Sequence, residues 1–557
     1  MLVSDYIIDN LIKLGVTDIW GIPGGVVFDY MYAAKRRERD INLHLSYHEQ
    51  AAGFEAQGFA QASGKIGVCF ATRGPGVTNV VTAITDAYYE SVPVILFTAH
   101  ANPYGKSKSR SEFDQEVNTN YFFKNITKKV VQIETTESFV RDFNDGIYRA
   151  LEGRKGPVIF DILTSVLKSE IKCKTLKFPT CTISDSKINL ILDSIIQSKR
   201  PIFLIGDGIK QAGAVTLFNK IVDKFKIPVI SSRGAEDIIP KSKYYFGYVG
   251  SHGVRTANFI ISKSDCVVCI GNRVSFPFNS NSFSPLFRTA KWIRIDIDNA
   301  ELTREIPDSI SINCDLNNLL KELNFAEIPS LDFSAWTDVC NKIKSKLNNL
   351  DNTEPVVKLT EILKFLSKKI SYIASDVGNN EFWLSLAYLK SGINTNIIYS
   401  KSFGVLGSGL PKAIGCYYST HKPVICVCGD QGFQFNIQEL QVLIHEKIPV
   451  WIIVVNNQSS GMIKDAEQKK YTSLVQVNEE NGYKSLDLKR ISEAYGINYI
   501  DYNIDVQLND LDENAPCIIN MRINASVSLT PFLPAGRKCY DLEPKLDKSI
   551  LEQIENL

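Results

Sequence analysis

Two polar residues that follow apolar runs are the first candidates for chemistry in this sequence. Asp430 lies just after the apolar run 424–428, and Asn457 lies just after the apolar run 450–455. A helical pattern separates the two runs, which predicts a βαβ unit. Because the carboxyl ends of parallel strands share the edge where ligands bind, we expect both side chains to face one small volume. Oxygen ligands of this kind suit Mg²⁺ that carries a phosphate, although an ordinary crossover with polar loop ends has the same pattern.

Glu49 is a second candidate, far upstream. It follows the strand-like run 43–47 and precedes a segment of small residues at 51–64. Small residues let another backbone or a flat ligand come close. A carboxylate at the amino end of a helix is stabilised in its charged form. The alternative is a first-turn helix glutamate with no catalytic role.

The elements that must position these residues alternate between strand and helix patterns, which is typical of parallel sheets covered by helices. The sequence predicts an α/β fold with three doubly wound parallel-sheet domains. We place these domains at residues 1–165, 185–325 and 356–525, followed by a C-terminal tail at 526–557. The stretch 326–355 has little periodicity, and we interpret it as a connector.

Composition narrows the classes of partner. The 557 residues carry 62 basic and 61 acidic side chains, so the net charge of +1 indicates no nucleic-acid or anionic-membrane partner. No apolar run approaches the roughly 18 residues that span a bilayer. The amino terminus lacks the basic region of a signal peptide, and the 12 cysteines are too sparse for a disulfide framework. We therefore expect a cytoplasmic protein.

Ordered short motifs run along nearly the whole chain. They are GIPGG at 21–25, HEQ at 48–50, RGPG at 73–76 with Asn79, QE at 115–116, KNITK at 124–128, GVLGSGLPKAIG at 404–415, GD at 429–430 and NN at 456–457. With these motifs the sequence resembles the thiamine-diphosphate-dependent 2-oxo-acid decarboxylases and carboligases, most closely the acetolactate synthase branch. The resemblance implies a pyrimidine-binding domain, a central nucleotide-fold domain and a diphosphate-binding domain, in that order.

The resemblance also implies the cofactors and their ligands, which are thiamine diphosphate and Mg²⁺. Glu49 would hydrogen-bond the pyrimidine ring of the cofactor, and Gln115 would be a second catalytic residue. The metal ligands would be Asp430, Asn457 and the backbone carbonyl of Ser459. The cofactor-binding residues would be Pro23, Gly24, Asn79, Asn379, Asn380, Gly404, Leu406, Gly429 and Gly432.

By the same resemblance, the reaction is decarboxylation of a 2-oxo acid such as pyruvate, followed by addition of the two-carbon acyl unit to a carbonyl acceptor. The alternative is a simple decarboxylase that releases an aldehyde. In this family the acid and the metal meet across a subunit interface, which implies a homodimer or a homotetramer.

The sequence departs from the acetolactate synthase pattern at two positions of the acceptor pocket. Asp114 stands where the branch has phenylalanine, and Ala466 stands where its biosynthetic members have tryptophan. The changes add a charge and open volume, which favours a larger hydroxylated acceptor. A nucleotide-linked keto-sugar fits, as in a carboligase of the yersiniose type. A second 2-oxo acid stays open as the alternative.

FAD binding is also left open by the resemblance. The central domain retains several residues typical of the FAD contacts, but the second arginine of the pattern is absent. The FAD candidates are His252, Gly253, Gly271, Arg273 and Asp296. Because carboligation needs no redox step, bound FAD would be structural.

Overall fold

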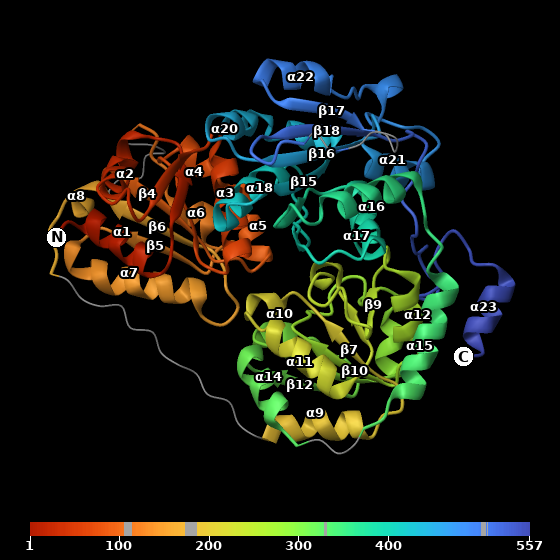
Figure 1. The fold of residues 1–557 in the computed structure, drawn as a ribbon. Helices are drawn as coiled ribbons and strands as arrows, with labels where there is room; N and C mark the ends of the chain where they lie inside the picture. The colour runs from red at the N-terminus through yellow and green to blue at the C-terminus, as the bar shows by residue number, and fades with distance from the viewer. Residues whose placement is uncertain (105–113, 173–185, 328–330, 503–507, 509–510) are drawn as a thin grey trace. The chain divides into compact units, whose positions relative to one another are not determined.

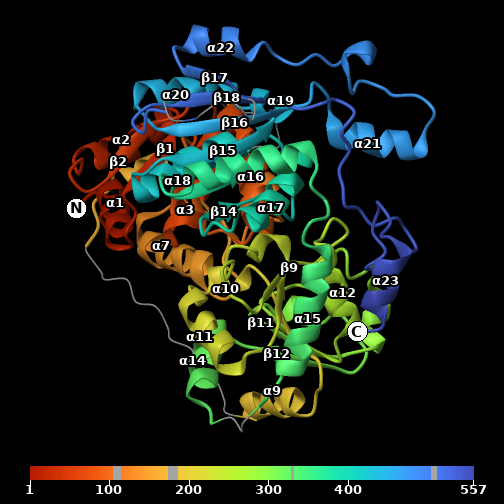
Figure 2. The same cartoon turned by 45° about the vertical axis from the view of Figure 1, so that its right-hand side comes forward.

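The computed structural model describes residues 1–104, 114–172, 186–327, 331–502, 508 and 511–557. Its three sheets each contain six strands, and the paired strands run parallel (Figures 1 and 2). Apolar residues fill the strands because both faces of such sheets are covered by helices. The α/β prediction with three parallel-sheet layers is confirmed.

Sheet 1 has the strand order β2-β1-β3-β4-β6-β5. Its strands are β1 (Asp18–Gly21), β2 (Asn42–Leu45), β3 (Gly67–Phe70), β4 (Val94–His100), β5 (Lys129–Ile133) and β6 (Val158–Leu163). The helices of this part of the chain are α1 (Val3–Lys13), α2 (Phe28–Lys35), α3 (Glu49–Ser63), α4 (Pro75–Asn79), α5 (Val81–Tyr89), α6 (Thr119–Phe123), α7 (Thr136–Leu151) and α8 (Thr164–Leu167).

Sheet 2 has the order β12-β11-β10-β7-β8-β9. Its strands are β7 (Pro201–Ile205), β8 (Val229–Ser231), β9 (Tyr245–Tyr248), β10 (Cys266–Ile270), β11 (Lys291–Asp296) and β12 (Ser309–Asn313). The helices are α9 (Ser186–Ile196), α10 (Gly208–Gln211), α11 (Val215–Phe225), α12 (Arg255–Lys263), α13 (Asn299–Leu302), α14 (Leu316–Phe325) and α15 (Ser334–Leu347). One core contains α9, α11 and α14, and a second contains α12 and α15, so the sheet is covered on both faces (Figure 1).

Sheet 3 has the order β14-β13-β15-β16-β18-β17. Its strands are β13 (Tyr372–Ser375), β14 (Asn396–Ile398), β15 (Val424–Gly429), β16 (Val450–Asn456), β17 (Asn498–Tyr502) and β18 (Cys517–Arg522). The helices that follow α15 are α16 (Glu354–Leu366), α17 (Asn379–Ser391), α18 (Gly409–Thr420), α19 (Asp430–Gln434), α20 (Leu440–His445), α21 (Gly461–Lys470), α22 (Leu488–Tyr495) and α23 (Lys548–Glu555).

The described chain forms two compact units. The first holds sheets 1 and 3, and the second holds sheet 2 with α16, most of α17 and residues 526–557. The domain boundaries drawn from the sequence stay a prediction. Within the segment 526–557, Cys539, Leu542 and Ile554 are buried, and α23 contributes to the core that contains α12.

The interpretation of 326–355 as an unpatterned connector is wrong, because α15 lies within it. Trp336, Cys340, Ile343 and Leu347 are buried at spacings of one helical turn. Lysines and polar residues between these positions dilute the apolar pattern, so the helical period is weak in the sequence alone.

Candidate active site

Asp430 and Asn457 lie at the ends of two neighbouring strands. β15 and β16 pair in parallel, with Gly429 opposite Val455, so the residues that follow them leave the sheet at one edge. Both side chains are buried, with exposed fractions of 2% for Asp430 and 6% for Asn457. The βαβ prediction for this segment therefore matches the observed register, and the two oxygen-bearing side chains sit at the ligand-binding edge of sheet 3.

Burial disfavours the charged form of the Asp430 carboxylate. Burial raises its pKa to about 6, while hydrogen bonds from Tyr483 and Ser485 lower it only in part. The Tyr483 hydroxyl donates to Asp430 Oδ2 at 2.9 Å. Both donors are neutral, so a cation at this carboxylate would hold it in the charged form.

Asn457, Asn379 and Gly461 enclose one small volume. A Cβ atom on Gly461 would lie 2.5 Å from Asn457 Nδ2 and 3.2 Å from Asn379 Nδ2. Asn457 Oδ1 accepts the Ser459 amide at 3.2 Å, which closes a tight turn after β16. Asn379 Nδ2 donates to Asp465 Oδ2 at 3.1 Å. Among the residues that the structure describes, buried Asn379 Oδ1 has no hydrogen-bond partner, as expected of a group that contacts a ligand.

Asp376, which the sequence analysis missed, organises the neighbouring loop. Its carboxylate accepts the amides of Gly407 at 2.8 Å and Ser408 at 3.1 Å, and burial raises its pKa to about 6. A Cβ on Gly432 would lie 2.0 Å from Asp376 Oδ2 and 3.3 Å from Leu406 Cδ1. Only glycine fits at 432, and the loop that carries Leu406 is held against it. The missed signal was an acid directly after β13, at the same sheet edge.

Glu49 begins α3 and is 8% exposed. Asn79 Nδ2 donates to Glu49 Oε2 at 3.0 Å, which fixes the carboxylate. A Cβ on Gly76 would lie 3.1 Å from Glu49 Oε1, so the RGPG turn also borders it. His48 caps the helix by accepting the Gln50 amide at 3.1 Å. The structure thus brings Glu49, Asn79 and Gly76 together, and these residues belong to two of the sequence motifs.

The residues beside Glu49 contact the segment that follows Asp430 in the same chain. The Tyr47 amide donates to both Glu439 carboxylate oxygens, at 3.1 and 3.2 Å. Asn436 Nδ2 donates to Gln50 Oε1 at 3.3 Å and to the Gly407 carbonyl at 2.7 Å. The parts of one chain that carry sheets 1 and 3 therefore contact each other through Tyr47 and Gln50, and Glu439 was not identified from the sequence.

The other predicted site residues of the first unit lie in loops and at helix ends. A Cβ on Gly24, which follows Pro23, would lie 2.8 Å from Thr72, and a Cβ on Gly74 would lie 2.7 Å from Gln115 Cβ. Asn380 donates to the Asp376 carbonyl at 2.8 Å. Asp114, Ala466 and Gly404 are exposed. Gly404 has a left-handed φ of 73°.

The FAD candidates belong to the second unit. The Gly271 amide donates to the Ile295 carbonyl at 2.9 Å, which places Gly271 at the end of β11, where Asp296 lies. His252 Nδ1 lies 3.1 Å from the Pro531 carbonyl, and a Cβ on Gly253 would lie 2.3 Å from the Gly250 amide. FAD binding stays a prediction.

The donor set at the strand ends indicates the kind of metal. Within the described part of the chain, no group of three or more His, Cys, Asp or Glu residues could hold a metal ion. The candidate site instead combines the Asp430 carboxylate with the Asn457 amide oxygen and a backbone carbonyl. Such hard oxygen ligands, with positions left for phosphate and water, fit Mg²⁺ and the diphosphate that it carries.

Comparison with known proteins identifies the class that this fold and site define. Three protein-family models match: thiamine pyrophosphate enzyme N-terminal TPP binding domain over residues 1–122, central domain over 188–323, and C-terminal TPP binding domain over 376–519. The chain belongs to the thiamine pyrophosphate enzymes, in an acetolactate synthase-like family.

The curated relatives are similar over almost their full length. The acetolactate synthase large subunit of Lactococcus lactis is 31% identical, covering 96% of this chain and 94% of the relative. A probable acetolactate synthase large subunit of Methanocaldococcus jannaschii is 30% identical, covering 100% and 98%. The isozyme 2 large subunit of Escherichia coli is 26% identical, covering 98% and 99%. Separately, none of the described helices is both long and apolar enough to cross a membrane.

Proposed function

We propose that the protein is a carboligase that depends on thiamine diphosphate and Mg²⁺. It decarboxylates a 2-oxo acid, pyruvate in the first instance, and adds the two-carbon acyl unit to a carbonyl acceptor. The observation that carries the proposal is the pair of buried strand ends, where Asp430 and Asn457 leave neighbouring strands beside the unsatisfied Asn379. The printed names of the relatives support the reaction class.

Different residues of the chain would bind the metal, the diphosphate and the pyrimidine ring of the cofactor. Asp430, Asn457 and the Ser459 carbonyl would bind Mg²⁺, and Asn379 would donate the second hydrogen of its Nδ2 to the diphosphate. When bound, thiamine diphosphate supplies a carbon that accepts the negative charge released by decarboxylation. Glu49, fixed by Asn79, would hydrogen-bond the pyrimidine ring and control its protonation.

For the acceptor, we propose a nucleotide-linked keto-sugar as the candidate that the chain's own residues favour. Ala466 is exposed on α21, one residue beyond the Asp465 that bonds Asn379. In this proposal the small side chain of Ala466 gives room to a larger acceptor, and the exposed Asp114 would bond its hydroxyls. A second pyruvate is the acceptor suggested by the relatives' names, and a simple decarboxylase would release acetaldehyde.

Product analysis tests the reaction. The full-length protein, with thiamine diphosphate and Mg²⁺, is given pyruvate alone and pyruvate with a nucleotide-linked keto-sugar. Mass spectrometry should find the branched sugar in the second mixture. Acetolactate in both mixtures would assign a second pyruvate as acceptor, and acetaldehyde alone would assign the decarboxylase. No product in either mixture would refute the proposed function.

We also propose a cytoplasmic homodimer or homotetramer with the active site at the subunit interface. The proposal rests on the resemblance to the family, in which the acid and the metal come from different subunits. Sedimentation of the purified protein at several concentrations would reveal the assembly, and a stable monomer with full activity would contradict it.

A further inference from the structure

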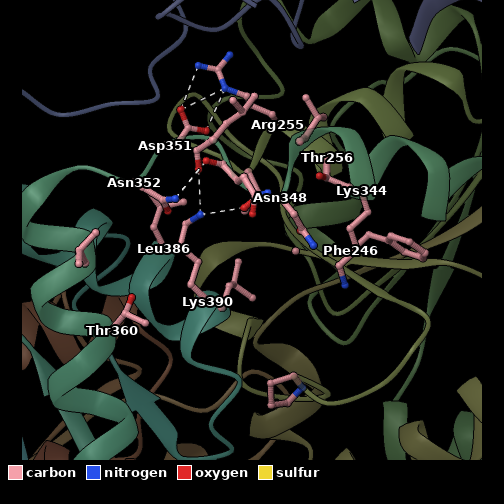
Figure 3. Close-up of a pocket in the computed structure, with 18 of the residues that line it drawn as sticks. Phe246, Arg255, Thr256, Lys344, Asn348, Asp351, Asn352, Thr360, Leu386 and Lys390 are labelled. Atoms are coloured by element: carbon pink, nitrogen blue, oxygen red, sulfur yellow. Dashed lines mark hydrogen bonds and ion pairs between the residues drawn. The ribbon is translucent and has the colours of Figure 1, made fainter. Parts of the chain in front are cut away.

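A cavity of about 500 Å³ lies in the second unit, among residues of β9, α12 and α15 on one side and of α16 and α17 on the other (Figure 3). All of its lining residues belong to the second unit. None of them is a candidate residue for thiamine diphosphate, Mg²⁺ or FAD. Its volume is in the range of small-molecule sites, roughly 300–1,000 Å³.

Six charged side chains line the cavity, and four of them neutralise one another. The Arg255 guanidinium bonds the Asp351 carboxylate at 3.0 Å, and the Lys364 ammonium lies 3.2 Å from the Glu361 carboxylate. Arg255 is further held by the Leu542 and Pro544 carbonyls, so it has a structural role. The remaining two side chains, both lysines, give the wall a net charge of two positive units.

Lys344 and Lys390 are these two lysines, and neither ion-pairs with a carboxylate among the residues that the structure describes. Lys344 Nζ donates to the Tyr245 carbonyl at 3.3 Å. Lys390 Nζ donates to the Asn348 and Leu350 carbonyls, at 3.2 and 2.9 Å. In the view of Figure 3 the two side chains lie on opposite sides of the cavity.

Burial of these ammonium groups is only partly offset by the surrounding protein. Desolvation lowers the pKa of both lysines, and for Lys390 the attraction of Asp351 compensates only in part, since that carboxylate is bonded to Arg255. Two charges held in this way favour an anionic ligand. The first turn of α12, which has no side-chain cap from Val254, adds amides at the same wall.

The rest of the wall is mixed, because polar side chains such as Asn348, Asn352 and Thr360 lie among apolar ones. Phe246, Leu386 and Leu389 line the cavity together with Val254. Figure 3 shows Phe246 and Leu386 among the side chains around the same space as Lys344 and Lys390. A ligand that fills the cavity therefore combines negative charge with an organic part that covers these apolar side chains, because a bare anion would leave them in contact with water.

We propose that this cavity binds a phosphate monoester with a compact organic part. A phosphate monoester carries close to two negative charges at neutral pH, which matches the two uncompensated lysines. A monocarboxylate would leave one lysine unpaired, and inorganic phosphate would leave the apolar side chains of the wall uncovered. The inference is independent of the proposed carboligase activity.

Calorimetric titration of the full-length protein tests the site, with thiamine diphosphate and Mg²⁺ present to occupy the candidate active site. Phenyl phosphate is the probe, phenol lacks the charge, and inorganic phosphate lacks the organic part. Phenyl phosphate should bind saturably and at least about tenfold more tightly than either. Lys344→Met and Lys390→Met should each weaken it about tenfold or more, because each removes one charge-assisted bond.

Lys263→Met is the matched control. Burial lowers the pKa of Lys263 as well, and its Nζ donates to the Glu555 carbonyl at 3.1 Å, but it does not line the cavity. The Lys263→Met variant should bind phenyl phosphate with the same affinity as the wild type. Absence of saturable binding, wild-type affinity in both cavity variants, or equal binding of inorganic phosphate would overturn the proposal.

Protection of lysines from chemical modification in the wild-type protein gives a second test, which does not depend on the folding of a variant. Phenyl phosphate should slow the acetylation of Lys344 and Lys390 by acetic anhydride and leave Lys263 unprotected, as read by peptide mass spectrometry. Equal acetylation rates of Lys344 and Lys390 with and without the probe would refute the site.

Discussion

Asp430 and Glu49 are buried acids that the chain holds in different ways. Asp430 receives hydrogen bonds from neutral groups, and its pKa is raised to about 6 by burial. Glu49 is fixed by the Asn79 amide and bordered by Gly76. The arrangement at Asp430 fits a metal ligand, because a bound cation would balance the negative charge of the buried carboxylate. The arrangement at Glu49 fits an acid that bonds one defined group of a ligand.

Replacing Glu49 by glutamine should lower kcat for pyruvate consumption by roughly 10²-fold or more, because the amide cannot exchange a proton with the pyrimidine ring. Binding of thiamine diphosphate, followed by calorimetry, should change little. Glu137→Gln is the matched control, since Glu137 is an exposed first-turn glutamate of α7. A turnover in Glu49→Gln equal to that of the control would exclude the assigned role.

The site residues that are polar and follow an apolar run could be predicted from the sequence. Asp430, Asn457 and Glu49 all have this local signal. Asp376 and Tyr483 could not be predicted in this way. Tyr483 lies in a loop, and only the folded chain brings its hydroxyl to Asp430. Asp376 follows a four-residue strand that is too short to be distinctive.

At the scale of elements, α3 and α18 pack so closely that they join sheets 1 and 3. A Cβ on Gly58 would lie 2.2 Å from the Lys412 carbonyl, and a Cβ on Gly415 would lie 1.9 Å from the Glu55 carbonyl. Lys412 Nζ of α18 also bonds Asp86 Oδ2 of α5 at 2.7 Å, and both side chains are fully buried. The run of small residues in α3 is thus explained by a helix neighbour.

Gly58→Ala and Gly415→Ala should each lower the free energy of unfolding by about 1–3 kcal/mol, since the added methyl group meets rigid backbone. Urea denaturation of the first unit measures the change. Gly25→Ala is the control, because nothing lies within 4 Å of a Cβ at that position. Equal stability of all three variants would show that the two helices do not approach as described.

His44 of β2 links the edge of sheet 1 to the loop after α20. Its Nε2 lies 2.8 Å from Asp18 Oδ1, and its Nδ1 lies 3.0 Å from Glu446 Oε2, while Tyr418 also bonds Glu446. These carboxylates raise the pKa of His44 against the opposing effect of burial, which is the largest single contribution. The protonated ring therefore stabilises the fold.

Because the folded pKa of His44 lies above the unfolded value, its stabilisation is complete below the unfolded pKa of about 6.5 and is lost as pH rises through the folded pKa. His44→Gln should therefore cost most stability at pH 6 and progressively less at alkaline pH. Urea midpoints of both proteins from pH 6 to pH 9 measure this. A destabilisation that stays constant over that range would contradict a charged His44.

The order of strands and helices was largely predictable, because buried parallel strands read as apolar runs. α15 was not, because its four buried positions are separated by lysines and polar residues. The packing of residues 526–557 with α12 was not evident either, since Pro and Gly interrupt any periodicity there. These contacts are long-range, and local patterns carry no information about them.

At the scale of the whole molecule, the proposed subunit interface predicts complementation. Glu49→Gln and Asp430→Ala should each be inactive alone. Co-expressed, they should form mixed dimers with one intact site, which gives about one quarter of the wild-type rate for random pairing. The rate of pyruvate consumption by the purified mixture measures it. A mixture as inactive as the single variants would place both residues of each site in one chain.

Pyruvate consumption by the full-length protein, with product identification, tests the carboligase assignment most directly. The assay is run with and without thiamine diphosphate and Mg²⁺, with and without a keto-sugar acceptor, and on Asp430→Ala. We expect consumption that requires both cofactors, a product with a new carbon–carbon bond, and loss of both in the variant. Consumption that is independent of the cofactors or unchanged in Asp430→Ala, or no consumption with any acceptor, would contradict it.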